Sequence, residues 1–222
     1  MSVDVLNALL WKAARAVSLL SGGTCRIQRY YFVAQPVSAS ALVAESSGRA
    51  IVIRRVDADD PLVAQFPRPQ EVIAARFRMG AVCFAAEREG QFIGFAWLKE
   101  DQYSEDEVRC LFLLDPVEHA AWDFDVYIDP AFRFGRTFAR LWDHVNQWLR
   151  ERGYRWSLSR ISAFNADSLA AHRRLGMRSI GSATFVCVRT VQLTLVGQAP
   201  FVHLGWRCDD VPTLRLRAPR YD

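Results

Sequence analysis

Arg133 and Arg136 stand just before a predicted helix, where arginine side chains commonly bind phosphate. An alternating apolar run over residues 124–128 stops at positions 129–130, and a helical pattern begins at Phe138, so a basic turn joins a strand to a helix. The unpaired N–H groups and positive dipole end of that helix attract anions, and arginine adds charge-assisted hydrogen bonds. A second interpretation, in which both arginines only solvate the start of the helix, stays open.

His172 and Asp125 are the candidates for proton transfer. An imidazole with its ordinary pKa of about 6.5 both donates and accepts a proton near neutral pH. Asp123 and Asp125 lie on the predicted strand with a parity opposite to that of its apolar side chains, and a β-bulge would turn one of them inward. Alternatively, the aspartates form structural ion pairs with Arg155 or Arg160, and His172 is a surface residue at the end of an arginine-rich helix.

Two strands, each followed by a helix, must position these side chains. The helix after the basic turn has one apolar face, made of Phe138, Leu141, Trp142, Val145 and Leu149. A strand over residues 154–163 follows, and a second helix opens at Asn165. The candidate residues therefore lie at strand ends and helix starts, where backbone groups are free to contact a ligand.

Residues 123–177 resemble the core of the GNAT-type N-acetyltransferase superfamily, whose members bind acetyl-CoA and pass its acetyl group to an amine. The first motif of that core is a strand end followed by a turn, and it matches Ile128, Pro130 and Arg133. The second motif is a helix that closes the cofactor site, and it matches Asn165, Ser168, His172, Leu175, Gly176 and Met177.

The basic turn departs from the family pattern. Arg136 and Phe138 occupy the positions where the family usually has two glycines, and Gly135 lies one place early. The main-chain amides that would hold the pyrophosphate survive such substitutions, because glycine matters there through its missing Cβ. His172 stands where the family often has the tyrosine that protonates the departing thiolate, so the resemblance assigns that role to His172.

The resemblance implies acetyl-CoA as acyl donor and direct transfer to an amine. The implied cofactor-binding residues are Val126, Ile128, Arg133, Phe134, Gly135, Arg136, Thr137, Phe138, Ala139, Asn165 and Ser168. Backbone N–H groups of the strand commonly hold the thioester carbonyl in this family, and Trp122 and Phe124 occupy the positions that often carry its base. Neither side chain accepts a proton, so Asp125 and His172 are the catalytic candidates. No cysteine lies beside the thioester in this register, which favours direct transfer over a covalent intermediate.

The rest of the chain fits an α/β fold of the α+β kind, with a mixed, mostly antiparallel sheet flanked by helices. Residues 48–56 predict a strand, residues 57–79 two short helices separated by prolines, and residues 81–99 a hairpin. This order resembles the opening half of the GNAT fold. We therefore expect a GNAT-like domain over residues 48–222, preceded by an N-terminal helix and strand extension over residues 1–47.

Residues 101–107 are acidic and polar, which predicts an exposed loop that leads into an extra strand. The carboxylates of Glu105, Asp106 and Glu107 are either a solvated face or an attraction for a cationic amine. The C-terminal residues 182–217 are rich in strand patterns. In the GNAT family the last two strands pair and line the acceptor pocket, and the resemblance implies the same here.

Composition limits the function classes. The chain has 222 residues, 51% of them hydrophobic, which is ample for a core, and a net charge of +4 without a basic block or RNA motif gives no support for nucleic-acid binding. Its five cysteines are odd in number and widely spaced, as reduced thiols are, and they show no metal-ligand spacing with the four histidines. We expect a cytoplasmic protein without a metal site.

Residues 5–20 predict an amphipathic helix that ends before Gly22 and Gly23. Asp4 and the charges within the run argue against a signal peptide. The helix packs against this subunit or a partner subunit, which would suit a homodimer, or it lies peripherally on a membrane surface. The alternatives to a general N-acetyltransferase are a catalytically silent acyl-CoA-binding or protein-interaction module and an acyltransferase for a membrane-linked acceptor.

Overall fold

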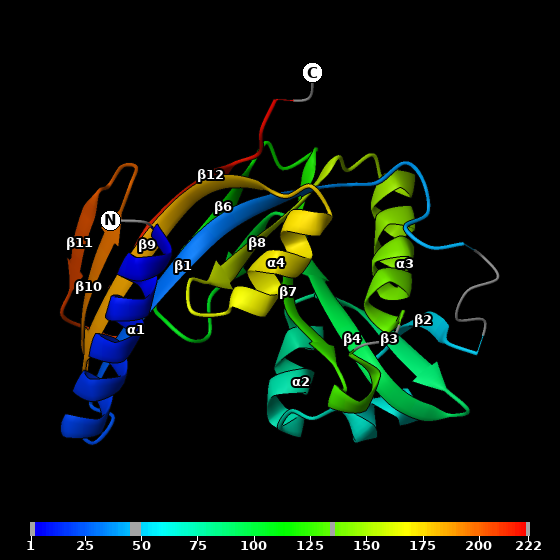
Figure 1. The fold of residues 1–222 in the computed structure, drawn as a ribbon, viewed down its shortest axis with the longest axis horizontal. Helices are drawn as coiled ribbons and strands as arrows, with labels where there is room; N and C mark the ends of the chain where they lie inside the picture. The colour runs from blue at the N-terminus through cyan, green and yellow to red at the C-terminus, as the bar shows by residue number, and fades with distance from the viewer. Residues whose placement is uncertain (1–2, 45–49, 134–135, 221–222) are drawn as a thin grey trace. The chain divides into compact units, whose positions relative to one another are not determined.

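The computed structural model describes residues 3–44, 50–133 and 136–220 (Figure 1). Contacts divide the chain into two units. Unit 1 comprises residues 1–36, 102–116 and 158–222, and unit 2 comprises residues 37–101 and 117–157. Both units combine helices with mostly antiparallel strands, so the predicted mixed α/β class is confirmed.

The strands of unit 2 run antiparallel in the order β7, β4, β3, β2. They are β2 (Val52–Val56), β3 (Val82–Arg88), β4 (Gln91–Lys99) and β7 (Ala120–Ile128). β3 and β4 form the predicted hairpin, and its turn residues Glu89 and Gly90 have φ values of 56° and 77°. Positive φ at both residues matches the right-handed twist of the strands, so a two-residue turn suffices.

The helices of unit 2 lie where the sequence predicts them. The 3-10 helix η1 (Pro61–Gln65) and helix α2 (Gln70–Arg78) are the two elements separated by prolines. Helix α3 (Thr137–Glu151) packs on β2, β3 and β4. Its buried apolar face consists of Leu141, Trp142, Val145, Trp148 and Leu149. This face follows the period of 3.6 residues that the sequence shows.

The larger sheet of unit 1 has the strand order β11, β10, β9, β1, β8. These strands are β1 (Cys25–Pro36), β8 (Trp156–Ser162), β9 (Arg178–Val188), β10 (Val191–Val196) and β11 (Val202–Gly205). β1 lies in the interior of the sheet and pairs antiparallel with β9. Tyr30, Phe32 and Val33 on β1 are at most 1% exposed. The strand placed in an N-terminal extension by its sequence position is therefore a core strand of unit 1.

Helix α1 (Val3–Leu20) packs against β1, as one of the sequence interpretations expects. Asn7 and Ala14 on this helix are buried, and Asn7 exchanges hydrogen bonds with the Tyr31 hydroxyl of β1. Among the residues that the structure describes, no helix is long and apolar enough to cross a membrane.

A smaller sheet of unit 1 has the strand order β12, β6, β5. Its strands are β5 (Gln102–Ser104), β6 (Leu111–Asp115) and β12 (Thr213–Arg217). β12 runs parallel to β6, whereas β11 pairs with β10. The implied pairing of the last two strands is therefore wrong, because each finds a different partner. An edge-on contact between Phe32 and Phe112, with ring centroids 5.2 Å apart, joins β1 to the smaller sheet.

Candidate active site

The basic turn of unit 2 starts where β7 ends at Ile128. Asp129 opens the short helix η2 (Pro130–Phe132), and its carboxylate accepts a hydrogen bond from a backbone N–H of that helix at 2.9 Å. Arg133 follows η2, and its Nε donates to the Ile128 carbonyl oxygen at 3.2 Å. These two contacts fix the path of the chain as it leaves the strand.

Helix α3 begins directly after the turn, and Arg136 occupies its N-cap position. Arginine has no hydrogen-bond acceptor, so this side chain cannot cap the N–H groups of the first helical turn. Arg133 and Arg136 are exposed, whereas Thr137 is buried. Two exposed guanidinium groups at a helix N-terminus suit a phosphate group. Phe134 and Gly135, which the sequence also assigns to the cofactor, lie outside the described residues.

The remaining cofactor candidates of unit 2 flank the turn. Val126 and Ile128 on β7 are half-buried, as are Phe138 and Ala139 on α3. The Phe138 ring lies 6.1 Å from the Trp142 ring, measured between centroids. The described candidates of the first motif therefore lie at the end of β7, in the turn and at the start of α3.

Strand β7 contains a β-bulge at Asp125. Phe124 pairs with Trp97 and Tyr127 pairs with Phe95, so two residues of β7 face one residue of β4. Asp125 has a φ of 44°, in the left-handed region. The predicted bulge is therefore confirmed, and it interrupts the ladder of backbone hydrogen bonds.

The Asp125 carboxylate forms ion pairs with two arginines of unit 2. Arg68 donates from Nε to Oδ2 at 2.8 Å and from Nη2 to Oδ1 at 2.5 Å. Arg76, whose side chain is 7% exposed, donates from Nη1 to Oδ2 at 2.5 Å. Both carboxylate oxygens are therefore occupied by guanidinium donors. The sequence expectation of Arg155 or Arg160 as the partner was wrong for Asp125.

The second motif forms helix α4 (Ala166–Arg174) of unit 1, with Asn165 as its N-cap. The Asn165 Oδ1 accepts a hydrogen bond from the Ser168 N–H at 3.0 Å. Gly176, which follows the C-cap residue of the helix, has a φ of 81°, and the Met177 N–H donates to the His172 carbonyl oxygen at 3.1 Å. This arrangement is a Schellman motif, which requires a residue that tolerates positive φ. The residues that carry the resemblance therefore also set the length of the helix.

A family model decides the classification. The model for the acetyltransferase (GNAT) family matches residues 52–177, which is more than half of the 222 residues. The chain belongs to the GNAT family of acetyltransferases. The matched segment runs from β2 to the end of α4 and includes the bulged strand, the basic turn and the Asn165 cap.

Solved structures resemble this GNAT protein at low sequence identity. A conserved protein of unknown function from Staphylococcus epidermidis aligns with a TM-score of 0.54 and 8% identity, over 78% of this chain and 66% of that chain. A protein from Novosphingobium aromaticivorans assigned to the GNAT family aligns with a TM-score of 0.48 and 16% identity, over 72% and 63% of the two chains. A tandem GNAT protein from the clavulanic acid biosynthesis pathway aligns with a TM-score of 0.47 and 11% identity, over 74% of this chain and 55% of that chain.

This GNAT chain spans less than two thirds of the length of each of those proteins. The alignment with the staphylococcal protein supports the fold alone. A search among curated proteins found no match.

His172 of the GNAT protein lies on α4 and is 5% exposed. Burial lowers the pKa of its imidazole from 6.5 to about 4, so the ring is neutral at pH 7. A neutral imidazole offers one hydrogen-bond donor and one acceptor, but it is a poor acid. The structure therefore rejects the interpretation of His172 as a surface residue, and its role in proton transfer stays a prediction.

Most residues of the acidic segment 101–107 are exposed, as the sequence predicts, but Glu105 within it is buried. Glu105 is 7% exposed and accepts hydrogen bonds from Arg160 at 2.7 and 3.0 Å. Burial raises the pKa of the Glu105 carboxyl, and the hydrogen bonds from Arg160 oppose that shift. The Tyr30 hydroxyl donates to the Glu107 carboxylate at 2.6 Å, and the Arg160 guanidinium lies over the Tyr30 ring. Arg160, from β8, makes this burial tolerable because it supplies a counter-charge.

Sequence reasoning missed Arg68 and Arg76 as residues of the candidate site. They precede Asp125 by 57 and 49 residues, and no periodicity links such distant positions. One signal was available, because Arg68 stands between Pro67 and Pro69. Prolines on both sides restrict the backbone and favour a fixed position for the side chain between them.

Proposed function

We propose that this protein transfers the acetyl group of acetyl-CoA to the amine of an acceptor molecule. The observation that carries the proposal is the pair of exposed arginines, Arg133 and Arg136, that precede the N-terminus of α3 in a chain of the GNAT family. The pyrophosphate of acetyl-CoA is the anion that this arrangement favours. The backbone N–H groups of the first helical turn and the two guanidinium groups are the donors that would hold it.

Acetyl-CoA supplies an activated thioester in this proposal. The amine nitrogen forms a bond to the carbonyl carbon, the C–S bond breaks, and the proton lost by the amine balances the proton gained by the thiolate. The bulge at Asp125 interrupts the strand ladder, and backbone N–H groups of β7 at this point would stabilise the carbonyl oxygen as it gains charge. In unit 1, Asn165 and Ser168 are proposed as cofactor-binding residues and His172 as the donor to the thiolate, as the family motif implies.

Calorimetric titration of acetyl-CoA into the full-length protein tests the cofactor proposal. We expect Arg133→Ala and Arg136→Ala each to weaken binding by roughly tenfold, since each removes a charge-assisted hydrogen bond. Arg150→Ala is the matched control, because Arg150 lies at the opposite end of α3. Absence of binding to the wild-type protein, or equal weakening by all three substitutions, would contradict the proposal.

A catalytically silent acyl-CoA-binding module is the second candidate. Both oxygens of Asp125 are engaged by arginines, and the His172 imidazole is neutral at pH 7, so neither proton-transfer candidate is poised for chemistry. A thiol-release assay with a panel of primary amines separates the candidates. Release of coenzyme A that depends on an amine supports the enzyme, whereas binding without release from any amine supports the silent module.

We also propose a cytoplasmic location, which the five free thiols support.

A homodimer and a peripheral membrane contact through α1 are further proposals that rest on the amphipathic sequence of that helix. Leu19 and Leu20 at its end are 73% and 90% exposed, so they are free to contact either partner. Co-sedimentation with anionic vesicles and mass measurement in solution distinguish the two, and Leu20→Ser is expected to weaken whichever contact exists.

A further inference from the structure

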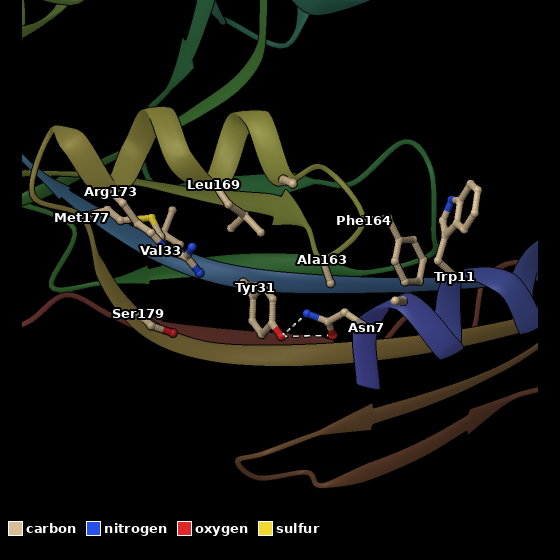
Figure 2. Close-up of a pocket in the computed structure, with 12 residues that line it drawn as sticks. Asn7, Trp11, Tyr31, Val33, Ala163, Phe164, Leu169, Arg173, Met177 and Ser179 are labelled. Carbon is tan, nitrogen blue, oxygen red and sulfur yellow. Dashed lines mark hydrogen bonds between the residues drawn. The ribbon is translucent and has the colours of Figure 1, made fainter. Parts of the chain in front are cut away.

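Unit 1 contains a cavity of about 800 Å³ between helices α1 and α4. Figure 2 shows its floor on β1, its walls on the two helices, and a third wall on the segment that joins β8 to α4. Cavities of 300 to about 1,000 Å³ are typical of sites for small organic ligands. The cavity is not lined by the cofactor and proton-transfer candidates of unit 1, which are Asn165, Ser168 and His172.

Aromatic and apolar side chains form most of the cavity surface. Trp11 of α1 and Phe164 lie at one end, and the Tyr31 ring lies on the floor (Figure 2). Leu169 and Met177 continue the apolar surface toward the other end. Trp11 is 43% exposed, so a large ring stands in water at the mouth of the cavity. Such surfaces favour a flat aromatic ligand, which stacks on rings at little entropic cost.

The floor of the cavity is held in place before any ligand arrives. The Asn7 Nδ2 donates to the Tyr31 hydroxyl at 2.8 Å, and that hydroxyl donates to the Asn7 Oδ1 at 3.2 Å (Figure 2). The two side chains therefore satisfy each other and fix the position of α1 against β1. A preformed surface binds a rigid ligand without the cost of ordering side chains.

Positive charge lies at the other end of the cavity. Arg173 of α4 reaches toward Val33 and Met177 (Figure 2), and no carboxylate within the described residues forms an ion pair with it. Arg29 of β1 lies beside the floor, with its guanidinium 5.9 Å from the centre of the Tyr31 ring. The buried Nε of Arg29 has no hydrogen-bond partner in the described part of the chain. No Asp or Glu is among the described residues that line the cavity, whereas Arg173 is, so the charge that these residues contribute is positive.

Much of this cavity comes from chain outside the family match. Asn7, Trp11, Tyr31 and Val33 all precede residue 52, where the match to the GNAT family begins. The cavity is therefore a feature that α1 and β1 add to the family core in unit 1, and the general activity of the family does not account for it.

We propose that this cavity binds a planar aromatic carboxylate as a ligand of its own. The rings of Trp11, Tyr31 and Phe164 contact the aromatic body, and Arg173 receives the carboxylate. A neutral aromatic molecule gains only the first of these contacts. An aliphatic acid gains the second without the stacking, so it binds more weakly than the aromatic acid.

Calorimetric titration of 2-naphthoate and 2-naphthylmethanol into the full-length protein tests the proposal. We expect the acid to bind more tightly than the alcohol. Arg173→Ala is expected to weaken binding of the acid roughly tenfold and to leave binding of the alcohol unchanged. Arg174→Ala is the matched control, since Arg174 is the next residue on the same helix, is exposed, and does not line the cavity. Trp11→Ala is expected to weaken both compounds, whereas Leu9→Ala, on an exposed position of the same helix, is expected to weaken neither.

Three results would overturn the proposal. The first is no binding of 2-naphthoate to the wild-type protein. The second is equal weakening by Arg173→Ala and Arg174→Ala, which would indicate a general attraction of anions to a basic helix. The third is displacement of 2-naphthoate by coenzyme A, which would make the cavity part of the cofactor site. None of these measurements requires turnover, so they stand apart from the test of acetyl transfer.

Discussion

The Asp125 carboxylate is held by a cluster of charges and aromatic rings. Its partners Arg68 and Arg76 each lie about 5.5 Å from the centre of an aromatic ring, Tyr127 for Arg68 and Trp97 for Arg76. The rings keep water away from the guanidinium groups, and so the charges depend on one another. Removal of one member takes a partner away from a charge that stays partly buried. A structural role for Asp125 therefore competes with its proposed role as a base.

Asp125→Asn is expected to lower the free energy of unfolding by about 3 kcal/mol, because it removes the charged carboxylate that pairs with the buried Arg76 and with Arg68. Urea unfolding at pH 7 measures this change. Asp57→Asn is the control, since it removes a carboxylate 3.9 Å from Arg55 in an exposed pair, and it is expected to change stability little. If Asp125→Asn keeps full stability and loses only turnover, Asp125 is a catalytic base instead.

Burial of His172 predicts a pH dependence of stability. Its folded pKa of about 4 lies below the ordinary value of 6.5, so the unfolded chain binds this proton more readily. The stabilisation is complete above the unfolded pKa and is lost as the pH falls toward the folded pKa. Between pH 7 and pH 5 we expect the wild type to lose about 2 kcal/mol more than His172→Gln in urea unfolding. The same pH profile for both proteins would show that His172 titrates normally and is accessible to water.

Among the elements, β4 and β7 place the candidate site through one close contact. Gly94 on β4 faces Ile128 at the end of β7, directly before the basic turn. A Cβ at Gly94 would stand 2.7 Å from the Tyr127 carbonyl oxygen, which is backbone and cannot rotate away. Because Gly94 has no side chain, β4 and β7 can approach each other closely at the end of β7, directly before the basic turn.

Gly94→Ala is expected to destabilise unit 2 by about 1 to 3 kcal/mol and to weaken acetyl-CoA binding, because the end of β7 must move. Thermal unfolding and calorimetric titration measure the two effects. Gly197→Ala is the control, since a Cβ at Gly197 meets nothing within 4 Å. Unchanged affinity in a destabilised Gly94→Ala protein would separate the strand contact from the cofactor turn.

For the whole molecule, the position of β1 decides where a folding unit can begin. β1 lies between β8 and β9, and Tyr30, Phe32, Val33 and Ala34 have at most 1% of their surface exposed. The family match begins only at residue 52. A core strand of unit 1 therefore comes from chain that the family model does not cover, and burial of its side chains contributes to the stability of that unit.

Truncation separates the contributions of α1 and β1. A protein of residues 24–222 lacks only α1 and is expected to unfold cooperatively. A protein of residues 48–222 also loses the interior strand β1. It is expected to lack the near-ultraviolet circular dichroism of packed aromatic rings in unit 1. Circular dichroism and urea unfolding of both proteins provide the comparison. Cooperative unfolding of residues 48–222 with full stability would support the domain boundary predicted from the sequence.

The sequence by itself determined the local elements and the family. The hairpin over residues 81–99, the apolar face of α3 and the ends of α4 depend on neighbours within a few residues, such as the Asn165 cap and Gly176. Turn conformation, helix caps and hydrophobic period are local properties, so a pattern of residue types is enough to predict them. The match to the GNAT family spans residues 52–177, which include these elements.

Only the tertiary structure decided which distant residues meet. Three features join positions that no sequence period relates. Asp125 pairs with Arg68 and Arg76, and Glu105 is buried beneath Arg160. The third feature is the insertion of β1 into the sheet of unit 1. An isolated charge in the sequence has many possible partners, and the choice depends on the free energy of burying it in the folded chain. Such a choice is a property of packing, and packing exists only once the strands and helices have come together.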